Sequence, residues 1–103
     1  MNCSRNDVVL LPIPFTDLTS RKVRPAVVIG QNRGDLFVVP VSSVLANTDF
    51  LLAEWSAAGL NVPSGVKAQL ATVEERLALK IVGKLAAADL KTLNQRLRMW
   101  LDL

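Results

Sequence analysis

Short apolar runs separated by polar segments dominate the first part of the chain. Residues 8–11, 24–30 and 36–41 are rich in valine, leucine and isoleucine, and each run has the length of one strand. Such runs, bounded by turn-forming residues, are typical of buried β-strands. The turn at residues 31–35 is short, so we expect the second and third strands to form a hairpin. The two prolines after the first run lack N–H donors, which places the far end of that strand at a sheet edge or a strand end.

The middle of the chain carries weaker signals for further strands. We expect three short ones, at residues 49–53, 66–72 and 78–85. Residues 54–59 are expected to form one helical turn that ends at a glycine, residues 61–65 a loop and residues 73–76 a charged turn. Short strands with turns about every 8 to 12 residues predict a small barrel or sandwich.

The spacing of apolar positions changes at the end of the chain. One alanine and four leucines recur at intervals of three and four, at Ala86, Leu90, Leu93, Leu97 and Leu101. This spacing predicts an amphipathic helix with basic and amide side chains on its other side. Asp89 in the first turn and Arg96 and Arg98 in the last match the helix dipole. We therefore expect a mainly β fold, a small β-barrel, with a C-terminal α-helix that covers one open end.

Length and composition indicate one domain, residues 1–103, with one modest hydrophobic core. No apolar run approaches the ~20 residues that cross a bilayer, and the polar N-terminus lacks the layout of a signal peptide. We expect a cytoplasmic protein with no membrane partner. Cys3 is the only cysteine, so no internal disulfide is expected, and we expect this residue in a loose terminus.

The absence of histidine and tyrosine limits the chemistry that the chain can perform. With no histidine and one cysteine, it cannot assemble an ordinary zinc site or a Ser-His-Asp or Cys-His system. Proton transfer must then use Asp, Glu, Lys, Arg, a hydroxyl group or water. The adjacent carboxylates Glu74 and Glu75 have no further acidic neighbours, so we interpret them as part of a solvated turn. We expect neither a metal nor a cofactor.

The charge of the chain is mildly basic and unevenly distributed. The formal net charge is +3, with basic residues in excess at both ends and acidic residues in excess between positions 35 and 75. The densest basic cluster contains Arg21, Lys22 and Arg24 and lies between two apolar runs. This cluster is either a solvated turn or a contact for nucleic-acid phosphates, and charge alone leaves both interpretations open.

Several of these segments occur in the order found in a known family. They are residues 12–18 (PIPFTDL), 24–29 (RPAVVI), 40–43 (PVSS), 54–60 (EWxxAGL, where x is any residue), 63–64 (PS), 69–73 (QLATV), 76–77 (RL) and 81–85 (IVGKL). Over about residues 6 to 101, the chain resembles the PemK/MazF-type toxins of type II toxin–antitoxin systems. The first segment is fairly specific for this family, because it precedes a basic loop and a strand that starts with Arg-Pro. The other segments are informative because they occur together in the family's order.

The resemblance implies a growth-inhibiting toxin with an SH3-like barrel, a C-terminal helix and a homodimeric assembly. It implies an endoribonuclease that cleaves single-stranded RNA, such as mRNA, at selected sequences without a metal. It also implies a cognate antitoxin whose disordered tail covers the RNA groove.

Cleavage of this kind uses the ribose 2′-hydroxyl as nucleophile and leaves a cyclic phosphate and a 5′-hydroxyl. It needs a proton acceptor, a proton donor and positive charge at the phosphorus. By the resemblance, Arg24 lines the active groove, where its guanidinium can hold phosphate oxygens; its alternative role is a salt bridge at the sheet edge. Ser42 and Ser43 fall where the family has a hydroxyl that contacts the scissile phosphate. We prefer Ser42 for this role, although strand ends also carry serine for turn formation.

The loop before the second strand should flank the RNA. This suggests RNA contacts from Thr16, Asp17, Ser20, Arg21 and Lys22. The carboxylate of Asp17 either orients Arg24, accepts a proton or caps its own turn.

The segment at residues 66–72 departs from the family pattern. Some members have an arginine and an aspartate here that serve as base and acid, whereas this chain has Lys67 and Gln69. Ala71 also replaces a common basic residue before Thr72. We expect Lys67 to act in catalysis as a point charge on the phosphate, and Gln69 and Thr72 to contact RNA. The departure predicts a weak or altered ribonuclease.

Two other functions stay open. CcdB relatives share the barrel and poison DNA gyrase through the end of the C-terminal helix, which here comprises residues 98–103. A degenerate toxin would instead bind RNA or antitoxin without cutting. Trp55 and Trp100 have the flat rings that stack on unpaired bases, but we expect both in the core.

Overall fold

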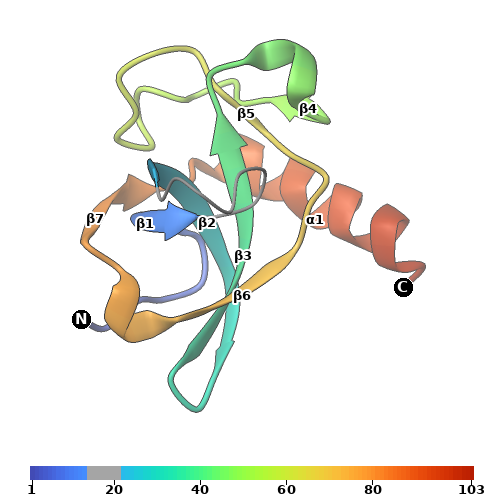
Figure 1. The fold of residues 1–103 in the computed structure, drawn as a ribbon. Coiled ribbons are helices and arrows are strands. Elements are labelled where there is room, and N and C mark those ends of the chain that lie inside the picture. Colours follow the sequence, from blue (N-terminus) through green and yellow to red (C-terminus); the bar gives the residue numbers. More distant parts are fainter. Residues whose placement is uncertain (14–21) are drawn as a thin grey trace.

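The valine-rich runs form the centre of one antiparallel sheet in the computed structural model, which describes residues 1–13 and 22–103 (Figure 1). Their strands are β1 (Asp7–Ile13), β2 (Lys22–Asn32) and β3 (Asp35–Ser42). The predicted hairpin between β2 and β3 is confirmed. Arg33 and Gly34 form its tip with φ values of 49° and 86°, and two-residue hairpin turns favour such positive values.

Four shorter strands extend this sheet. They are β4 (Phe50–Leu51), β5 (Gly65–Val66), β6 (Ala71–Glu74) and β7 (Lys80–Lys84). The strand order is β4-β5-β3-β2-β1-β7, with β6 also paired to β3. The predicted mainly β fold with one C-terminal helix is confirmed. Within the described residues, however, the sheet follows an open path and is not hydrogen-bonded into a closed barrel.

The predicted strand at residues 66–72 is in fact two strands. β5 pairs with the end of β3, whereas β6 pairs with its first half, so the chain leaves the sheet between them. In this crossing the backbone N–H of Gln69 donates to the carbonyl of Lys67 (2.8 Å). The charged turn predicted at residues 73–76 is also shifted, because its first two residues belong to β6 and a 3-10 turn follows at Glu75–Leu77.

The first proline of the β1 run lies where its missing N–H donor is tolerated. β7 pairs with β1 only between Asp7 and Leu10, whereas Pro12 pairs with Val23 of β2. In this part of the described sheet, β1 therefore has one neighbouring strand, as the sequence predicts for a proline-containing strand end.

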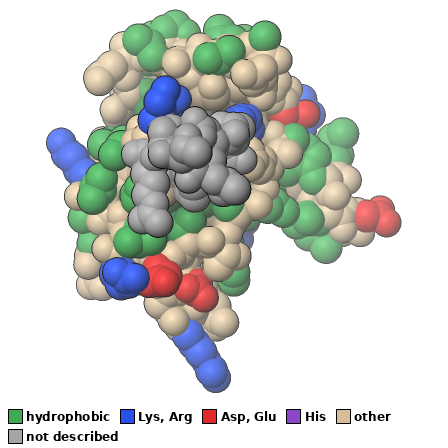
Figure 2. Space-filling model, viewed as in Figure 1, with side chains coloured by type: hydrophobic (Ala, Val, Ile, Leu, Met, Phe, Trp, Pro, Cys, Tyr) green, Lys and Arg blue, Asp and Glu red, His purple; other side chains and the backbone are tan. Residues whose placement is uncertain are grey.

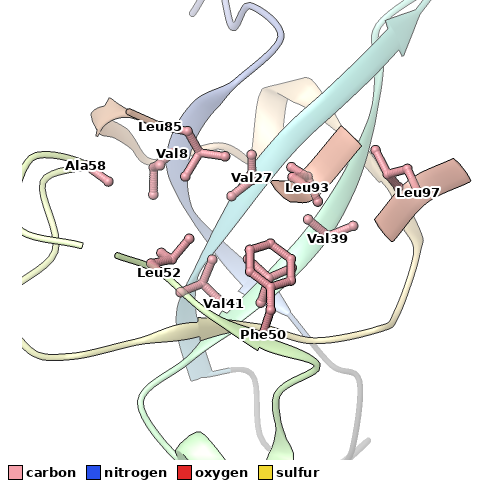
Figure 3. Close-up of a cluster of buried hydrophobic side chains, with 11 residues drawn as sticks. Val8, Val27, Val39, Val41, Phe50, Leu52, Ala58, Leu85, Leu93 and Leu97 are labelled. Atoms are coloured by element: carbon pink, nitrogen blue, oxygen red, sulfur yellow. The ribbon is translucent and has the colours of Figure 1, made fainter. Parts of the chain in front are cut away.

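Side chains on the two faces of the central strands build two hydrophobic clusters. Adjacent residues point to opposite faces of a strand, so Val8 of β1 enters one cluster and Val9 the other. Figure 3 shows the first cluster, in which side chains from the strands and from the helix point toward one another. Its buried members are Val8, Val27, Val39, Val41, Phe50, Leu52, Ala58, Val66, Leu85, Leu93 and Leu97.

The C-terminal helix α1 (Ala87–Leu101) covers this first cluster. Leu93 and Leu97 are buried as predicted, whereas Leu101 is exposed because the helix continues past the sheet (Figure 1). Trp55 and Trp100 are half-buried against the same cluster, so the prediction that both serve the core is confirmed.

The prediction of a loose N-terminus around Cys3 is wrong. The side chain of Cys3 is buried, and its backbone N–H donates to Oε2 of Glu75 (2.9 Å). Glu75 therefore ties the N-terminus to the end of β6 and is not simply a solvated turn residue. Burial raises the pKa of the Cys3 thiol, and the negative charges of Glu75 and Asp7 raise it further.

A bilayer-spanning helix is not found among residues 1–13 and 22–103, since none of their helices is both long and apolar enough.

Candidate functional site

A cavity of about 430 Å³ opens where the ends of β2, β3 and β5 meet. Four of the residues that line it are sequence-predicted site residues: Arg24, Ser42, Ser43 and Lys67. The remaining lining residues are Leu10, Pro25, Pro40, Val41, Val44, Asn47, Gly59, Leu60, Asn61, Val62, Ser64 and Val82. This volume falls within the range of about 300–1,000 Å³ that is usual for small-molecule sites.

Sheet register brings Arg24 and Ser42 to the same end of the sheet. Ala26 of β2 lies opposite Pro40 of β3 in an antiparallel pair. Continuing this register by two residues along each strand carries β2 to Arg24 and β3 to Ser42. Both residues line the cavity.

Ser42 is oriented by the turn that follows β3. Its Oγ accepts a hydrogen bond from the backbone N–H of Val44 (3.0 Å). The turn role anticipated for this serine is therefore real. It uses an acceptor lone pair of the hydroxyl, and a serine hydroxyl still has its proton to donate. Ser43, the next residue, is exposed at the cavity edge.

Lys67 reaches the cavity from the other side of β3. It directly follows β5, and its backbone N–H donates to the carbonyl of Pro40 (2.9 Å). This bond fixes the backbone of Lys67 beside the end of β3. Because β2 and β5 flank β3 on opposite sides, Arg24 and Lys67 approach the end of that strand from opposite directions.

The described lining of the cavity contains two cations and no carboxylate. Ion pairs among the described residues join Arg76 to Glu74, Lys84 to Asp7 and Arg96 to Asp49, so no described carboxylate pairs with the arginine of β2. A cavity with these groups offers charge-assisted hydrogen bonds to an anion, and an arginine fork matches the geometry of phosphate oxygens.

The other residues that the sequence predicts to contact RNA are not among the described residues that line the cavity. Lys22 is exposed at the start of β2, two residues before the cavity arginine and therefore on the same face of the strand. The segment 14–21, with the predicted contacts Thr16, Asp17, Ser20 and Arg21, lies outside the described residues.

Gln69 and Thr72 do not line the cavity. Thr72 is exposed on β6, where it lies opposite Phe37 of β3. That position is five residues from Ser42, or roughly 17 Å along the strand at about 3.3 Å per residue. Thr72 instead borders a separate apolar hollow with Phe37 and Leu70.

Three polar residues of the cavity were not anticipated as site residues: Asn47, Asn61 and Ser64. The last two lie in the predicted loop at residues 61–65, and loops commonly carry binding residues. Their position against β3 depends on contacts between distant segments, which the local sequence pattern does not reveal. A cluster of three or more potential metal ligands is not found among the described residues.

Comparison with known proteins identifies a family and its fold. Residues 4–101 match the family described as PemK-like, MazF-like toxin of type II toxin–antitoxin system. No curated protein matches the chain. The solved structure of Mycobacterium tuberculosis toxin MazF-mt6 is similar with a TM-score of 0.74 and 17% identity, covering 94% of this chain and 97% of that one.

A second similar structure is an endoribonuclease in complex with its cognate antitoxin from mycobacterial species. It has a TM-score of 0.73 and 18% identity, covering 100% of this chain and 97% of that one. At such identities the two structures establish a common fold.

Proposed function

The chain belongs to the PemK-like, MazF-like toxins of type II toxin–antitoxin systems, and from this premise we propose that it is an endoribonuclease that cuts single-stranded RNA. The observation that supports this proposal is the meeting of Arg24, Ser42 and Lys67 in one cavity. Two cations and a hydroxyl group from three segments suit a phosphodiester, which is an anion that gains charge as it reacts.

The proposed reaction is a transesterification at phosphorus. The ribose 2′-oxygen forms a bond to the adjacent phosphorus, and the bond from phosphorus to the 5′-oxygen breaks. The products are a 2′,3′-cyclic phosphate and a 5′-hydroxyl. One proton leaves the 2′-hydroxyl and one is delivered to the leaving 5′-oxygen.

Arg24 and Lys67 supply positive charge to the phosphorane in this mechanism. Arg24 presents two parallel N–H donors to the non-bridging oxygens, and Lys67 acts from the opposite side of β3 as a point charge. The hydroxyl of Ser42 donates to a phosphate oxygen while its turn holds it in place. Ser43 is a second contact at the rim of the cavity.

The described lining of the cavity offers fewer groups for the two proton transfers than for charge stabilisation. Its described lining has no carboxylate, and the chain has no histidine. General acid–base catalysis contributes about 10²–10⁴-fold where a well-placed group exists. We expect charge stabilisation to carry most of the rate and the enzyme to be slower than one with a dedicated acid and base.

An antitoxin is the proposed protein partner. One similar structure is described as a complex with its cognate antitoxin, and a cavity with two cations suits the carboxylates of an antitoxin segment. Such a segment would occupy the cavity in competition with RNA. We propose that the toxin acts in the cytoplasm, where mRNA is available.

The test compares three proteins on mixed-sequence single-stranded RNA in EDTA: wild type, Arg24→Ala and Arg33→Ala. Arg33 is an exposed arginine at the β2–β3 turn and does not line the cavity. We expect wild type and Arg33→Ala to cut equally, and Arg24→Ala to lose about 10²–10³-fold, as removal of a transition-state donor does. Equal activity of Arg24→Ala and wild type would contradict this assignment. RNA left intact by wild type would favour a toxin that acts without cutting RNA.

A further inference from the structure

Much of the cavity plays no part in the chemistry proposed above. Besides the cations, the chain between Gly59 and Val62 contributes all four of its residues to the lining. Val44 and Asn47, after β3, line the cavity as well. These six residues are apolar except for the two amide side chains of Asn47 and Asn61, so the part of the cavity that they line suits a flat, uncharged group with hydrogen-bonding edges.

The 59–62 segment is held close to β7 by direct contact of two backbones. A Cβ on Gly59 would lie 2.1 Å from the carbonyl oxygen of Val82, and a Cβ on Gly83 would lie 2.3 Å from that of Ala58. Glycine at both positions allows this close approach. The segment is therefore fixed against the sheet.

Asp89 of α1 fixes the start of the turn at residues 53–59 that leads into the 59–62 segment. This residue is 2% exposed, and its carboxylate accepts the backbone N–H groups of Ala53 (2.8 Å) and Glu54 (2.9 Å). After the segment, the carbonyl of Ser64 accepts the N–H of Leu52 (2.9 Å). The loop is thus anchored at both ends, which gives the segment the rigidity that selective binding requires.

Two of the hydrophobic side chains that line this part of the cavity are exposed. Val44 is 57% exposed and Val62 is 49% exposed, and both line the cavity. Figure 2 shows hydrophobic side chains gathered on the part of the molecule where Figure 1 places β4 and β5. A base held between apolar side chains would cover such groups.

We propose that the 59–62 segment is a nucleobase subsite that gives the ribonuclease its sequence preference, an inference that rests on the proposed function. The occupant is a base attached to the phosphate at Arg24 and Lys67, because these cations and the 59–62 segment line one cavity of about 430 Å³. Asn61 is the specificity residue. An asparagine amide donates to N7 and accepts from the exocyclic amine of adenine, so adenine is the preferred base.

Cleavage-site sequencing on a randomised RNA tests the proposal with wild type, Asn61→Ala and Asn32→Ala. Asn32 is exposed at the end of β2 and does not line the cavity. We expect wild type and Asn32→Ala to favour adenine at one position next to the cut. Asn61→Ala should lose this preference by about 5- to 150-fold, the effect of one good bidentate contact. An unchanged base preference in Asn61→Ala would overturn the proposal.

A binding measurement separates failure of the subsite from failure of the nuclease function. The probes are the four non-cleavable 2′-O-methyl dinucleotides ApA, ApU, UpA and UpU. Tighter binding of the adenine-containing probes by wild type, lost in Asn61→Ala, supports the subsite even if no RNA is cut. Equal affinity of wild type for all four probes would overturn the subsite even if RNA cleavage occurs.

Discussion

Ser42 illustrates how a single side chain can serve both the fold and the site. Its Oγ accepts the N–H of Val44 (3.0 Å), which fixes the hydroxyl at the end of β3 beside the cavity. The sequence suggested two competing roles, a turn and a phosphate contact. The two are compatible, because a hydroxyl accepts with a lone pair and donates with its proton.

Replacing Ser42 with alanine should therefore reduce RNA cleavage. A hydrogen bond to a charged group contributes about 1.5–3 kcal/mol, so kcat/KM should fall roughly 10- to 150-fold. Ser42→Thr keeps the hydroxyl and should retain most of the activity. Ser56→Ala, at an exposed position outside the cavity lining, is the matched control. Wild-type kcat/KM in Ser42→Ala would exclude the phosphate contact.

Cys3 should make the stability of the protein depend on pH in the alkaline range. Burial, then the charges of Glu75 and Asp7, raises the pKa of its thiol above the ordinary value of 9.0. Above pH 9.0 the unfolded chain loses this proton while the folded protein keeps it, so unfolding releases a proton and the free energy of unfolding falls as pH rises.

Urea unfolding of wild type and Cys3→Ala, at neutral pH and above pH 9.0, measures this effect. The difference in unfolding free energy between the two proteins should shrink as pH rises. A constant difference across the range would show that the thiol proton is not linked to folding.

At the scale of elements, hydrophobic patterns within single segments of the sequence predict the long strands and the helix. The runs at residues 8–11, 24–30 and 36–41 are strands, and the apolar spacing after residue 86 is a helix. The two-residue strands β4 and β5 exist because each pairs with a neighbour brought close by the fold. Tertiary pairing of this kind leaves little trace in local sequence, which is why residues 66–72 were predicted as one strand.

The loop that completes the cavity escaped prediction for the same reason. Residues 61–64 lie outside regular structure as expected, whereas Gly65 begins β5. The position of this loop depends on contacts with distant segments. Asp89 lies in the first turn of its helix, as expected from the dipole. Its carboxylate also accepts backbone N–H groups of residues 53 and 54, which the sequence does not predict. Arg24 and Ser42 were identified through the resemblance to the toxin family, whose motifs place both residues beside strands that the hydrophobic pattern predicts.

A comparison of two glycines measures how much a side chain at residue 59 would destabilise the fold by colliding with Val82. Gly59 and Gly34 have φ values of +88° and +86°, but a Cβ at position 34 would meet nothing within 4 Å. Gly34→Ala should cost about 1–2 kcal/mol, the penalty of the left-handed conformation. Gly59→Ala should cost more, since its Cβ would also collide with Val82. Equal losses in urea unfolding would mean that the loop moves away freely.

At the scale of the whole molecule, an edge of the sheet and the end of the helix lie together. β4 is at one end of the strand order, and its Leu51 is 58% exposed. Arg96 of α1 pairs with Asp49 just before β4 (2.8 Å), and Met99 after it is 68% exposed. An unpaired strand edge beside exposed apolar side chains favours association with another chain.

We expect the protein to form a homodimer through this surface. Sedimentation velocity at micromolar concentration should give a dimer for wild type and a monomer for Leu51→Asp. The control is Leu79→Asp, another exposed leucine, which precedes β7 and should leave the dimer intact. A wild-type protein that sediments only as a monomer would contradict this prediction.

The most direct test of the account is the chemistry of the RNA ends that the wild-type protein produces. Mass spectrometry of fragments from a single-stranded RNA digested in EDTA identifies both ends of each cut. Attack by the 2′-hydroxyl at the Arg24 cavity predicts 2′,3′-cyclic phosphates and 5′-hydroxyls. Fragments with 3′-hydroxyls and 5′-phosphates, or RNA that stays intact, would contradict it.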